Sequence, residues 1–269
     1  MITVEYHYIK TKYQSRPEIR SGLQKRKIMK KLTALVLVTL SISSCTAQWG
    51  KKVAGNGNIV TIERTTGDYE EIGVSGWFDV ELVDGREGQL TLTGEDNLLE
   101  HIVTDVKNGH LSVRVEKGYN LKPSSWKEGI HITIPVESIK SIALSGSGDI
   151  IGRKKLKSNN LQVAISGSGD VTLDVETDQI SAAMSGSGDM NLSGEASNFE
   201  VSISGSGDIE AYELNAENVD ASVSGSANIN VTAHNRLKAR VSGSGDIKYR
   251  GNPTKVDTKT SGSGDISKG

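Results

Sequence analysis

The sequence predicts an all-β fold, a β-solenoid in which stacked coils of about 19–21 residues share one core. The first observation is a repeated pentapeptide, Ser-Gly-Ser-Gly-Asp, whose copies are separated by 21, 19, 19, 20, 18 and 19 residues when one variant is included. The copies begin at Ser145, Ser166, Ser185, Ser204, Ser242 and Ser261, and the variant begins at Ser224. The second observation is that apolar residues around each copy fall on every other position, a period of two that is typical of strands.

Composition supports this fold and excludes others. Gly accounts for 30 of 269 residues, but it has no three-residue period, which excludes collagen. The single Cys excludes a disulfide scaffold. The net charge of −2 conceals an asymmetry, because residues 1–45 carry nine basic and two acidic side chains and the remainder 22 basic and 31 acidic, a net of −9. An acidic chain without a basic patch is not expected to bind nucleic acid.

The N-terminal segment has the pattern of a secretory signal. Residues 1–28 are expected to be an upstream extension outside the fold, and residues 29–45 a signal peptide with Met29 as the start. Lys30 and Lys31 precede the apolar run 32–40, which is too short to span a bilayer. Residues 42–45 resemble a bacterial lipobox, in which Cys45 would receive lipid; ordinary cleavage after Ala47 is the alternative.

The lipobox predicts a protein exported and lipid-anchored to the outer membrane, facing the periplasm or the cell exterior. The lipid would be its only contact with the membrane. Residues 46–52 are expected to be a short tether, and residues 53–269 a single solenoid.

Residues 53–140 are expected to form irregular N-terminal coils and a cap. Segments 54–59 and 75–80 match the repeat and predict two early coils. Alternating apolar residues predict strands within 89–116 and at 131–135, and a short helix is expected at 97–103. The loop 117–129 holds two of the few aromatic residues, Tyr119 and Trp126. Aromatic residues on loops often contact partners, so these two are candidate binding residues; the alternative is a cap that covers the first coils.

Residues 141–269 are expected to form the regular coils, each a strand, a glycine corner, a second strand and a polar loop. The two glycines of each pentapeptide share the parity of the buried apolar residues, which predicts a pinched corner without room for a side chain. The two serines and the aspartate then face solvent. No cap is visible in the sequence of the last coil, so it is expected either to pair with a second copy of the chain or to fray.

The repeated aspartates are the sharpest chemical feature. Stacking would bring successive carboxylates to within about 5 Å, so their repulsion needs compensation. One interpretation is that each carboxylate accepts backbone N–H bonds near the glycines or leans into water. The other is a row of Ca²⁺ sites, since Ca²⁺ prefers oxygen ligands. The candidates are Asp149, Asp170, Asp189, Asp208, Asp246 and Asp265.

Catalysis is not predicted. The carboxylates recur on every coil, whereas a glycosidase or lyase needs paired groups at one place. The histidines are scattered without metal-ligand spacing, and the serines belong to the repeat. The sequence therefore predicts no catalytic residue and no cofactor apart from the Ca²⁺ hypothesis.

Several segments together resemble a known family. They are the segment Met29–Trp49, Gly55-Asn56-Gly57, the stretch Val74–Leu82, Glu95–Leu99 and the Ser-Gly-Ser-Gly-Asp series. The chain is similar over roughly residues 53–266 to the putative auto-transporter adhesin, head GIN domain family, common in Bacteroidetes and of unassigned function. The resemblance implies a right-handed parallel β-helix in an exported or lipid-anchored protein, and no established activity.

The function expected from these observations is a non-catalytic, adhesin-type binding or structural module of the cell envelope. Its ligand would be a glycan, an envelope polymer or a protein. One alternative is a carbohydrate-active enzyme on a β-helix, which a carboxylate cluster meeting Arg or Lys in one groove would favour. Another is an accessory or sensor protein of the envelope.

Overall fold

A computed structural model describes residues 50–269. The extension at 1–28, the signal peptide at 29–45 and Cys45 lie outside the described residues. Within 50–269, strands dominate, with one four-residue helix, α2 (Asp96–Leu99), and one 3₁₀ helix, η1 (Trp126–Glu128). The strands are β1 (Lys51–Ala54), β2 (Ile59–Thr65), β3 (Glu71–Gly76), β4 (Asp79–Asp84), β5 (Gln89–Glu95), β6 (Ile102–Lys107), β7 (His110–Val115), β8 (Tyr119–Lys122), β9 (His131–Val136), β10 (Ser141–Gly146), β11 (Ile150–Gly167), β12 (Val171–Gly186), β13 (Met190–Gly205), β14 (Asp208–Gly225), β15 (Asn228–Gly243), β16 (Ile247–Arg250), β17 (Lys255–Gly262) and β18 (Ile266–Lys268).

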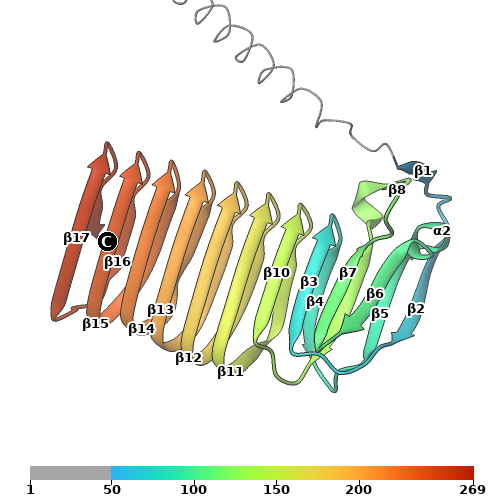
Figure 1. Cartoon of the computed structure of the whole chain (residues 1–269), viewed down its shortest axis with the longest axis horizontal. Helices are drawn as coiled ribbons and strands as arrows, with labels where there is room; N and C mark the ends of the chain where they lie inside the picture. The colour runs from blue at the N-terminus through green and yellow to red at the C-terminus, as the bar shows by residue number, and fades with distance from the viewer. Residues whose placement is uncertain (1–49) are drawn as a thin grey trace, which may run out of the picture. The chain divides into compact units, whose positions relative to one another are not determined.

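The second half is the predicted β-solenoid. Strands β10 to β18 stack in parallel, and each of the long strands β11–β15 traces almost one coil before the Ser-Gly-Asp corner starts the next (Figure 1). The pentapeptides are in exact register: Ser166 pairs with Ser185, and Ser185 with Ser204. The same pairing continues through the variant unit to Ser261. Each coil therefore repeats the backbone contacts of the one before.

The apolar positions predicted from the alternation form the core. The residue before each pentapeptide is at most 3% exposed from Leu144 to Val241, and the residue after each corner is fully buried from Ile150 to Ile247. The last coil departs from this pattern. Thr258 pairs with Ala239 and Thr260 with Val241, yet both threonines are exposed.

The glycine corners are as tight as predicted. The first pentapeptide glycine has φ between 123° and 147° in all seven coils, a region that favours glycine. A Cβ on Gly186 would lie 1.9 Å from the carbonyl oxygen of Gly167, and a Cβ on Gly188 would lie 2.0 Å from that of Gly169. The second position is the less strict, because Ala227 occupies it in the variant unit.

The polar segments expected to be loops are instead paired strand. Glu176 pairs with Glu195 and Thr177 with Ala196, although register shifts interrupt several of these ladders. Backbone groups at this bend can be satisfied by the coils on either side, so the chain need not leave the sheet to turn. The Thr177 hydroxyl fixes the bend by donating to the carbonyl oxygens of Asn159, at 3.2 Å, and Gln179, at 2.9 Å.

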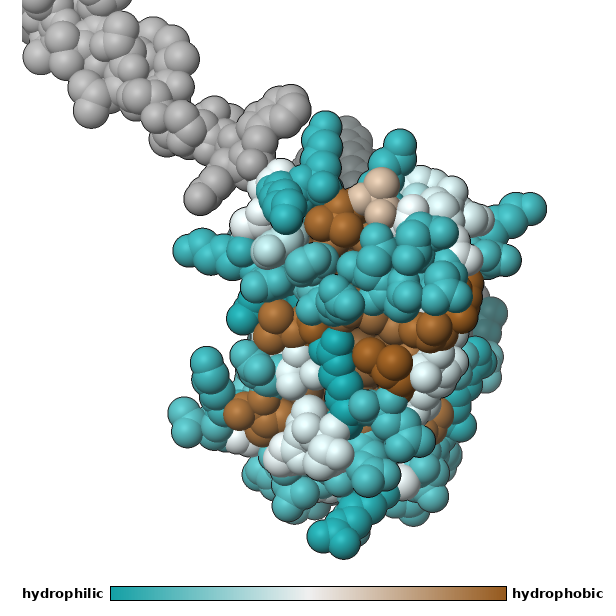
Figure 2. Space-filling model, turned by 90° about the vertical axis from the view of Figure 1, so that its right-hand side faces the viewer, coloured by the Kyte–Doolittle hydropathy of each residue, from teal (hydrophilic) through white to brown (hydrophobic). Residues whose placement is uncertain are grey.

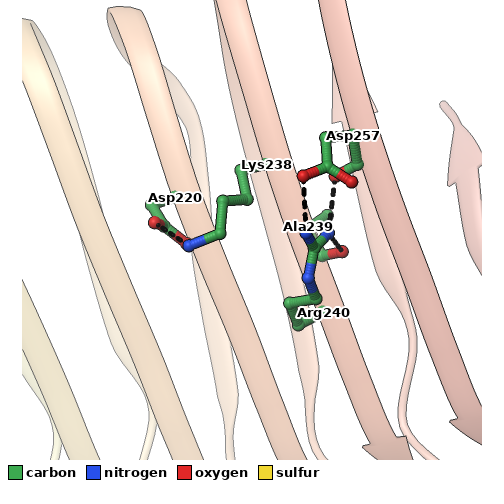
Figure 3. A network of polar contacts seen from close by, with 5 residues as sticks. All are labelled: Asp220, Lys238, Ala239, Arg240 and Asp257. Carbon is green, nitrogen blue, oxygen red and sulfur yellow. Dashed lines mark hydrogen bonds and ion pairs between the residues drawn. The ribbon is translucent and has the colours of Figure 1, made fainter.

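Ion pairs link adjacent coils on the outer surface of the sheet. Lys238 Nζ lies 2.6 Å from Asp220 Oδ2, and Arg240 Nη2 lies 2.5 Å from Asp257 Oδ2 (Figure 3). Arg240 also donates to the Asp257 carbonyl oxygen at 2.8 Å. These contacts connect β14 to β15 and β15 to β17.

The first half joins the solenoid through one true coil. Ser75 and Gly76 pair with Ser145 and Gly146, so the early coil predicted at 75–80 is confirmed. The early coil predicted at 54–59 is wrong. That segment connects β1, which pairs with β8, to β2, which is antiparallel to β5. Strand β1 begins at Lys51, two residues before the predicted start of the fold at 53.

A polar network explains why segment 54–59 matches the repeat without being a coil. Glu95, only 2% exposed, accepts from the backbone N–H of Gly57 at 2.6 Å and of Ser124 at 3.0 Å. Asp96 accepts from the side-chain amides of Asn56 and Asn58 at 2.6 and 2.8 Å. The small residues of this segment therefore serve as a turn around two carboxylates.

The N-terminal end of the sheets is closed by antiparallel strands, β2 with β5 and β6 with β7. Several of their apolar side chains are only partly covered, among them Val60, Ile62 and Val106, and Ile59 is 41% exposed. Figure 2 shows this end, with apolar side chains in a band between polar regions. At the other end, β17 pairs only with β15 among the described strands, so pairing of this coil with a second copy stays a prediction.

Candidate functional site

The corners of successive coils form a continuous surface, which we call the Ser/Asp edge. It comprises residues 145–149 and the equivalent residues of the later coils, and it begins with 75–79 of the first coil. The arrowheads of β3, β10–β15 and β17 mark it along the top of Figure 1. Both serines of every pentapeptide are exposed, while the second glycine is buried in all but the last coil. The edge thus presents two rows of hydroxyl groups and one row of aspartates.

The aspartates of this edge form a hydrogen-bonded ladder. Oδ1 of each one except Asp265, in the last coil, accepts from the backbone N–H of its counterpart in the next coil, at 2.8 to 3.3 Å. The ladder runs through Asp79, Asp149, Asp170, Asp189, Asp208, Asn228, Asp246 and Asp265. Each carboxylate before the last coil thereby gains a backbone donor that compensates part of the repulsion from its neighbours.

Asn228 fits the ladder because it keeps the accepting oxygen and adds a donor. Its Oδ1 accepts from Asp246 N at 3.1 Å, and its Nδ2 donates to Asp208 Oδ1 at 3.0 Å. A neutral amide at this rung also removes one of the like charges.

The ladder places one carboxylate per coil in a row, which differs from a cage around a cation. Ca²⁺ takes six to eight oxygen ligands. In the part of the chain that the structure describes, no group of three or more His, Cys, Asp or Glu side chains is arranged to hold a metal ion. Five of the six candidate aspartates, all but Asp265, accept a backbone N–H from the next coil, and Ca²⁺ binding at the row stays a prediction.

The N-terminal end of the edge carries aromatic side chains in place of the repeat residues. Trp77 stands where later coils have the second serine, and Phe78, fully buried, stands where they have the second glycine. Trp126, from η1, is 66% exposed and lies edge-on to Trp77, with ring centroids 5.3 Å apart. Trp126 is thus at the surface, as a binding residue must be.

Tyr119, the other candidate binding residue, has different neighbours. Its ring stacks on His101 with centroids 3.9 Å apart, and the Lys51 ammonium lies 5.9 Å from its centroid. His101 Nδ1 in turn lies 2.9 Å from Glu116 Oε2. Tyr119 is therefore engaged within the cap, and no aromatic contact joins it to Trp126 among the described residues.

A polar groove lies at the other bend of the coils, which sequence reasoning did not identify as a site. Its cavity volume is about 670 Å³, and an adjoining cavity of about 590 Å³ shares Lys157, Ser158 and Asn159 with it. It also holds Glu176, Asp178, Glu195, Glu217 and His234. Lys157 Nζ lies 2.9 Å from Glu176 Oε2, and this hydrogen bond and charge lower the pKa of Glu176.

The family model for "putative auto-transporter adhesin, head GIN domain" matches residues 68–253. Among solved structures, one described as a putative adhesin from Bacteroides fragilis is 26% identical, with a TM-score of 0.75, covering 80% of this chain and 99% of that one. One described as a putative lipid binding protein from Parabacteroides distasonis is 27% identical, with a TM-score of 0.68, covering 81% and 100%.

A third structure, described as a putative adhesin from Parabacteroides merdae, is 22% identical, with a TM-score of 0.66, covering 81% of this chain and 99% of that one. At this identity the likeness supports the fold alone. No curated protein is significantly similar to the chain. No helix in residues 50–269 is long and apolar enough to cross a membrane.

Proposed function

The chain belongs to the head GIN domain family, and from this premise we propose that it is an exported, non-catalytic binding module of the cell envelope. The observation that carries the proposal is the uniform Ser/Asp edge. Two serine hydroxyls recur in every coil and are exposed, and a carboxylate follows them in six of the seven pentapeptide coils, where it is exposed or half-buried. A repeated surface of this kind suits an extended ligand with repeated hydrogen-bonding groups, such as a glycan, an envelope polymer or a protein.

The adhesin description of the similar Bacteroides fragilis protein is consistent with this proposal, although it speaks only of that protein. An edge of preformed backbone also has little conformational entropy to lose on binding. The exposed serines are short side chains with few rotamers, so ordering them costs little.

The polar groove is the place where an enzyme on this fold would operate, because carboxylates meet Lys157 there. A glycoside hydrolase needs one carboxylic acid that stays protonated near neutral pH. The ion pair with Lys157 instead lowers the pKa of Glu176, which keeps that carboxylate ionised. Glu176 therefore does not suit the role of the general acid, and we favour binding over catalysis because of the repeated Ser/Asp edge.

The experiment is to apply the purified protein to a glycan array and to isolated envelope polymers, and to assay the same samples for newly formed reducing or unsaturated sugar ends. Binding without new ends supports the proposal. New ends that disappear in Glu176→Gln or Glu195→Gln would establish the enzyme instead. Absence of binding to every glycan, polymer and envelope protein extract tested would refute the binding module.

Lipid attachment at Cys45 is part of the proposed export. A Cys45→Ala variant is expected to move from the membrane fraction to the soluble fraction of the producing cells. Mass spectrometry of the intact protein should show a lipidated N-terminal cysteine in the native chain only. An unmodified chain that begins at Gln48 would favour ordinary cleavage after Ala47.

A further inference from the structure

We propose that Trp126, held edge-on by Trp77, forms a stacking platform for a sugar ring at the N-terminal end of the Ser/Asp edge. This inference rests on the proposed binding function and specifies its ligand class and anchoring residues. The starting observation is the corner of the first coil, at 75–79, which lacks the Ser-Gly-Ser pattern of the later corners. It carries Trp77 at the position where the later coils have their second serine.

The exposed indole is held in a set orientation. Trp126 makes a 71° edge contact with Trp77, whose ring centroid lies 5.6 Å from that of Phe78, and Phe78 is fully buried. This series of contacts connects the surface ring to the core. The turn that carries Trp126 is closed by Ser125, whose Oγ accepts from Lys127 N at 3.3 Å. A large aromatic surface that is both exposed and oriented is typical of a binding anchor.

Polar groups lie next to this platform on the same side of the chain. Asp79 occupies the outward position two residues after Trp77, and its Oδ2 lies 3.7 Å from His131 Nδ1. Both side chains are about half exposed. The Ser147 N–H donates to the Gly76 carbonyl oxygen at 2.9 Å, which places Ser147 as the next member of the row that Trp77 begins.

This combination matches the chemistry of a pyranose. One face of such a ring is made of C–H groups and can bury apolar area on an indole, while its hydroxyls donate to carboxylates and exchange hydrogen bonds with serine hydroxyls. A lipid chain would offer no hydrogen-bonding group to Asp79 and His131, which are about half exposed. Since the serine rows continue away from the platform coil by coil, the ligand is an oligosaccharide with one ring on Trp126 and the rest along the edge.

The test is a glycan-array screen followed by calorimetric titration of the full-length protein with the best array ligand. Linear hexasaccharides of glucose and of N-acetylglucosamine, and choline, serve as defined probes. Trp126→Ala is the main variant and Trp126→Phe retains an aromatic face. Val256→Ala is the matched control, because Val256 is also an exposed apolar residue, 50% exposed, but lies in the last coil. All variants should keep the melting temperature of the parent, since their side chains are at the surface.

We expect Trp126→Ala to weaken sugar binding by about tenfold or more, Trp126→Phe to weaken it less, and Val256→Ala to leave it unchanged. Equal affinity of the parent and Trp126→Ala would overturn the platform while leaving the binding module intact. Binding only to an envelope protein would do the same. Choline binding that depends on Trp126, without sugar binding, would replace the sugar by a cation. A parent protein that binds no ligand of any class would remove both proposals.

Discussion

The regular coils of residues 141–269 and the irregular region of residues 50–140 are held together in different ways. In the coils, the same backbone contacts recur at every corner, so register is set by glycines and by the aspartate ladder. The first half is instead stabilised by contacts of single residues. Glu95 closes a turn, and the buried Tyr69 hydroxyl donates to the Pro135 carbonyl oxygen at 2.6 Å. Each regular coil is therefore stabilised by contacts that its neighbours repeat, whereas the cap depends on contacts that occur only once.

The largest expected loss of stability comes from substituting the first glycine of a corner, and the second glycine of the same corner should be more tolerant. Gly186→Ala places a Cβ 1.9 Å from a carbonyl oxygen at a φ of 145°, so we expect a loss of about 3–5 kcal/mol in the free energy of unfolding. Gly188→Ala should cost clearly less, because Ala227 shows that a coil can adjust at this position. Chemical denaturation of both variants measures the difference. Equal losses would mean that Ala227 is accommodated only in its own coil.

The cap is expected to be sensitive to one carboxylate. Glu95→Ala leaves two backbone donors without their acceptor, which should cost about 2–3 kcal/mol. Glu100→Ala is the matched control, since Glu100 is exposed and adjacent to the same helix. Hydrogen exchange at Gly57 and Ser124 should accelerate in the Glu95 variant alone. A global loss without faster exchange at these two amides would contradict the assignment of Glu95 to this turn.

The same carboxylate predicts a pH dependence of the cap. Burial by itself would raise the pKa of Glu95, but the hydrogen bonds from Ser124 and Gly57 outweigh it, and the net effect is a lowered pKa. A lowered pKa in the folded state stabilises the fold above the unfolded value of about 4.3, and this stability is lost as the pH falls through the folded pKa. Melting temperatures from pH 7 to pH 2 should fall less for Glu95→Gln than for the parent, with Glu100→Gln as the control.

In the regular coils, replacing one ladder member should have a smaller effect. Asp189→Ala removes the acceptor of the Asp208 N–H and should cost about 1–2 kcal/mol, while Asp189→Asn should be nearly neutral, because the Asn228 amide oxygen accepts the equivalent bond from Asp246 in its own coil. Urea denaturation of the two variants gives the values. If Ca²⁺ bound the row, both substitutions would destabilise the protein, and a chelator would lower the melting temperature of the parent.

The smallest expected effect concerns the ion pairs between coils. Arg240→Gln should cost about 0.2–1 kcal/mol, because both partners are partly exposed and salt screens them. The difference from the parent should shrink between 0.05 and about 1 M salt, the range over which the screening length falls to about 3 Å. A loss independent of salt would indicate that the bond from Arg240 to the Asp257 carbonyl carries the contact.

Local pattern was enough to predict most of the regular half. The parity of Ile165 and Gly167 identified the buried side, and the spacing of the pentapeptides identified the coil. The same reasoning failed at segment 54–59, because a short Gly/Asn pattern suits a turn around carboxylates as well as a coil corner. It also assigned the polar segment around Thr177 to a loop, since composition does not reveal that a polar strand has neighbours on both sides.

The candidate site was only partly visible in the sequence. Trp126 and the aspartates were identified as unusual, but the partners that give them a role lie far along the chain. Trp77 is 49 residues before Trp126, and the donor to each ladder carboxylate is one coil away.

The sequence by itself determined the fold class, the coil length, the buried face and the exposed rows of serine and aspartate, because each follows from a short period that the backbone geometry of strands imposes. Only the tertiary structure decided how the aspartates are compensated, which early segment is a coil, and which aromatic side chains meet. Those outcomes depend on contacts between residues that stacking of the coils brings together. Such residues lie far apart along the chain, so a local sequence pattern does not reveal which of them meet.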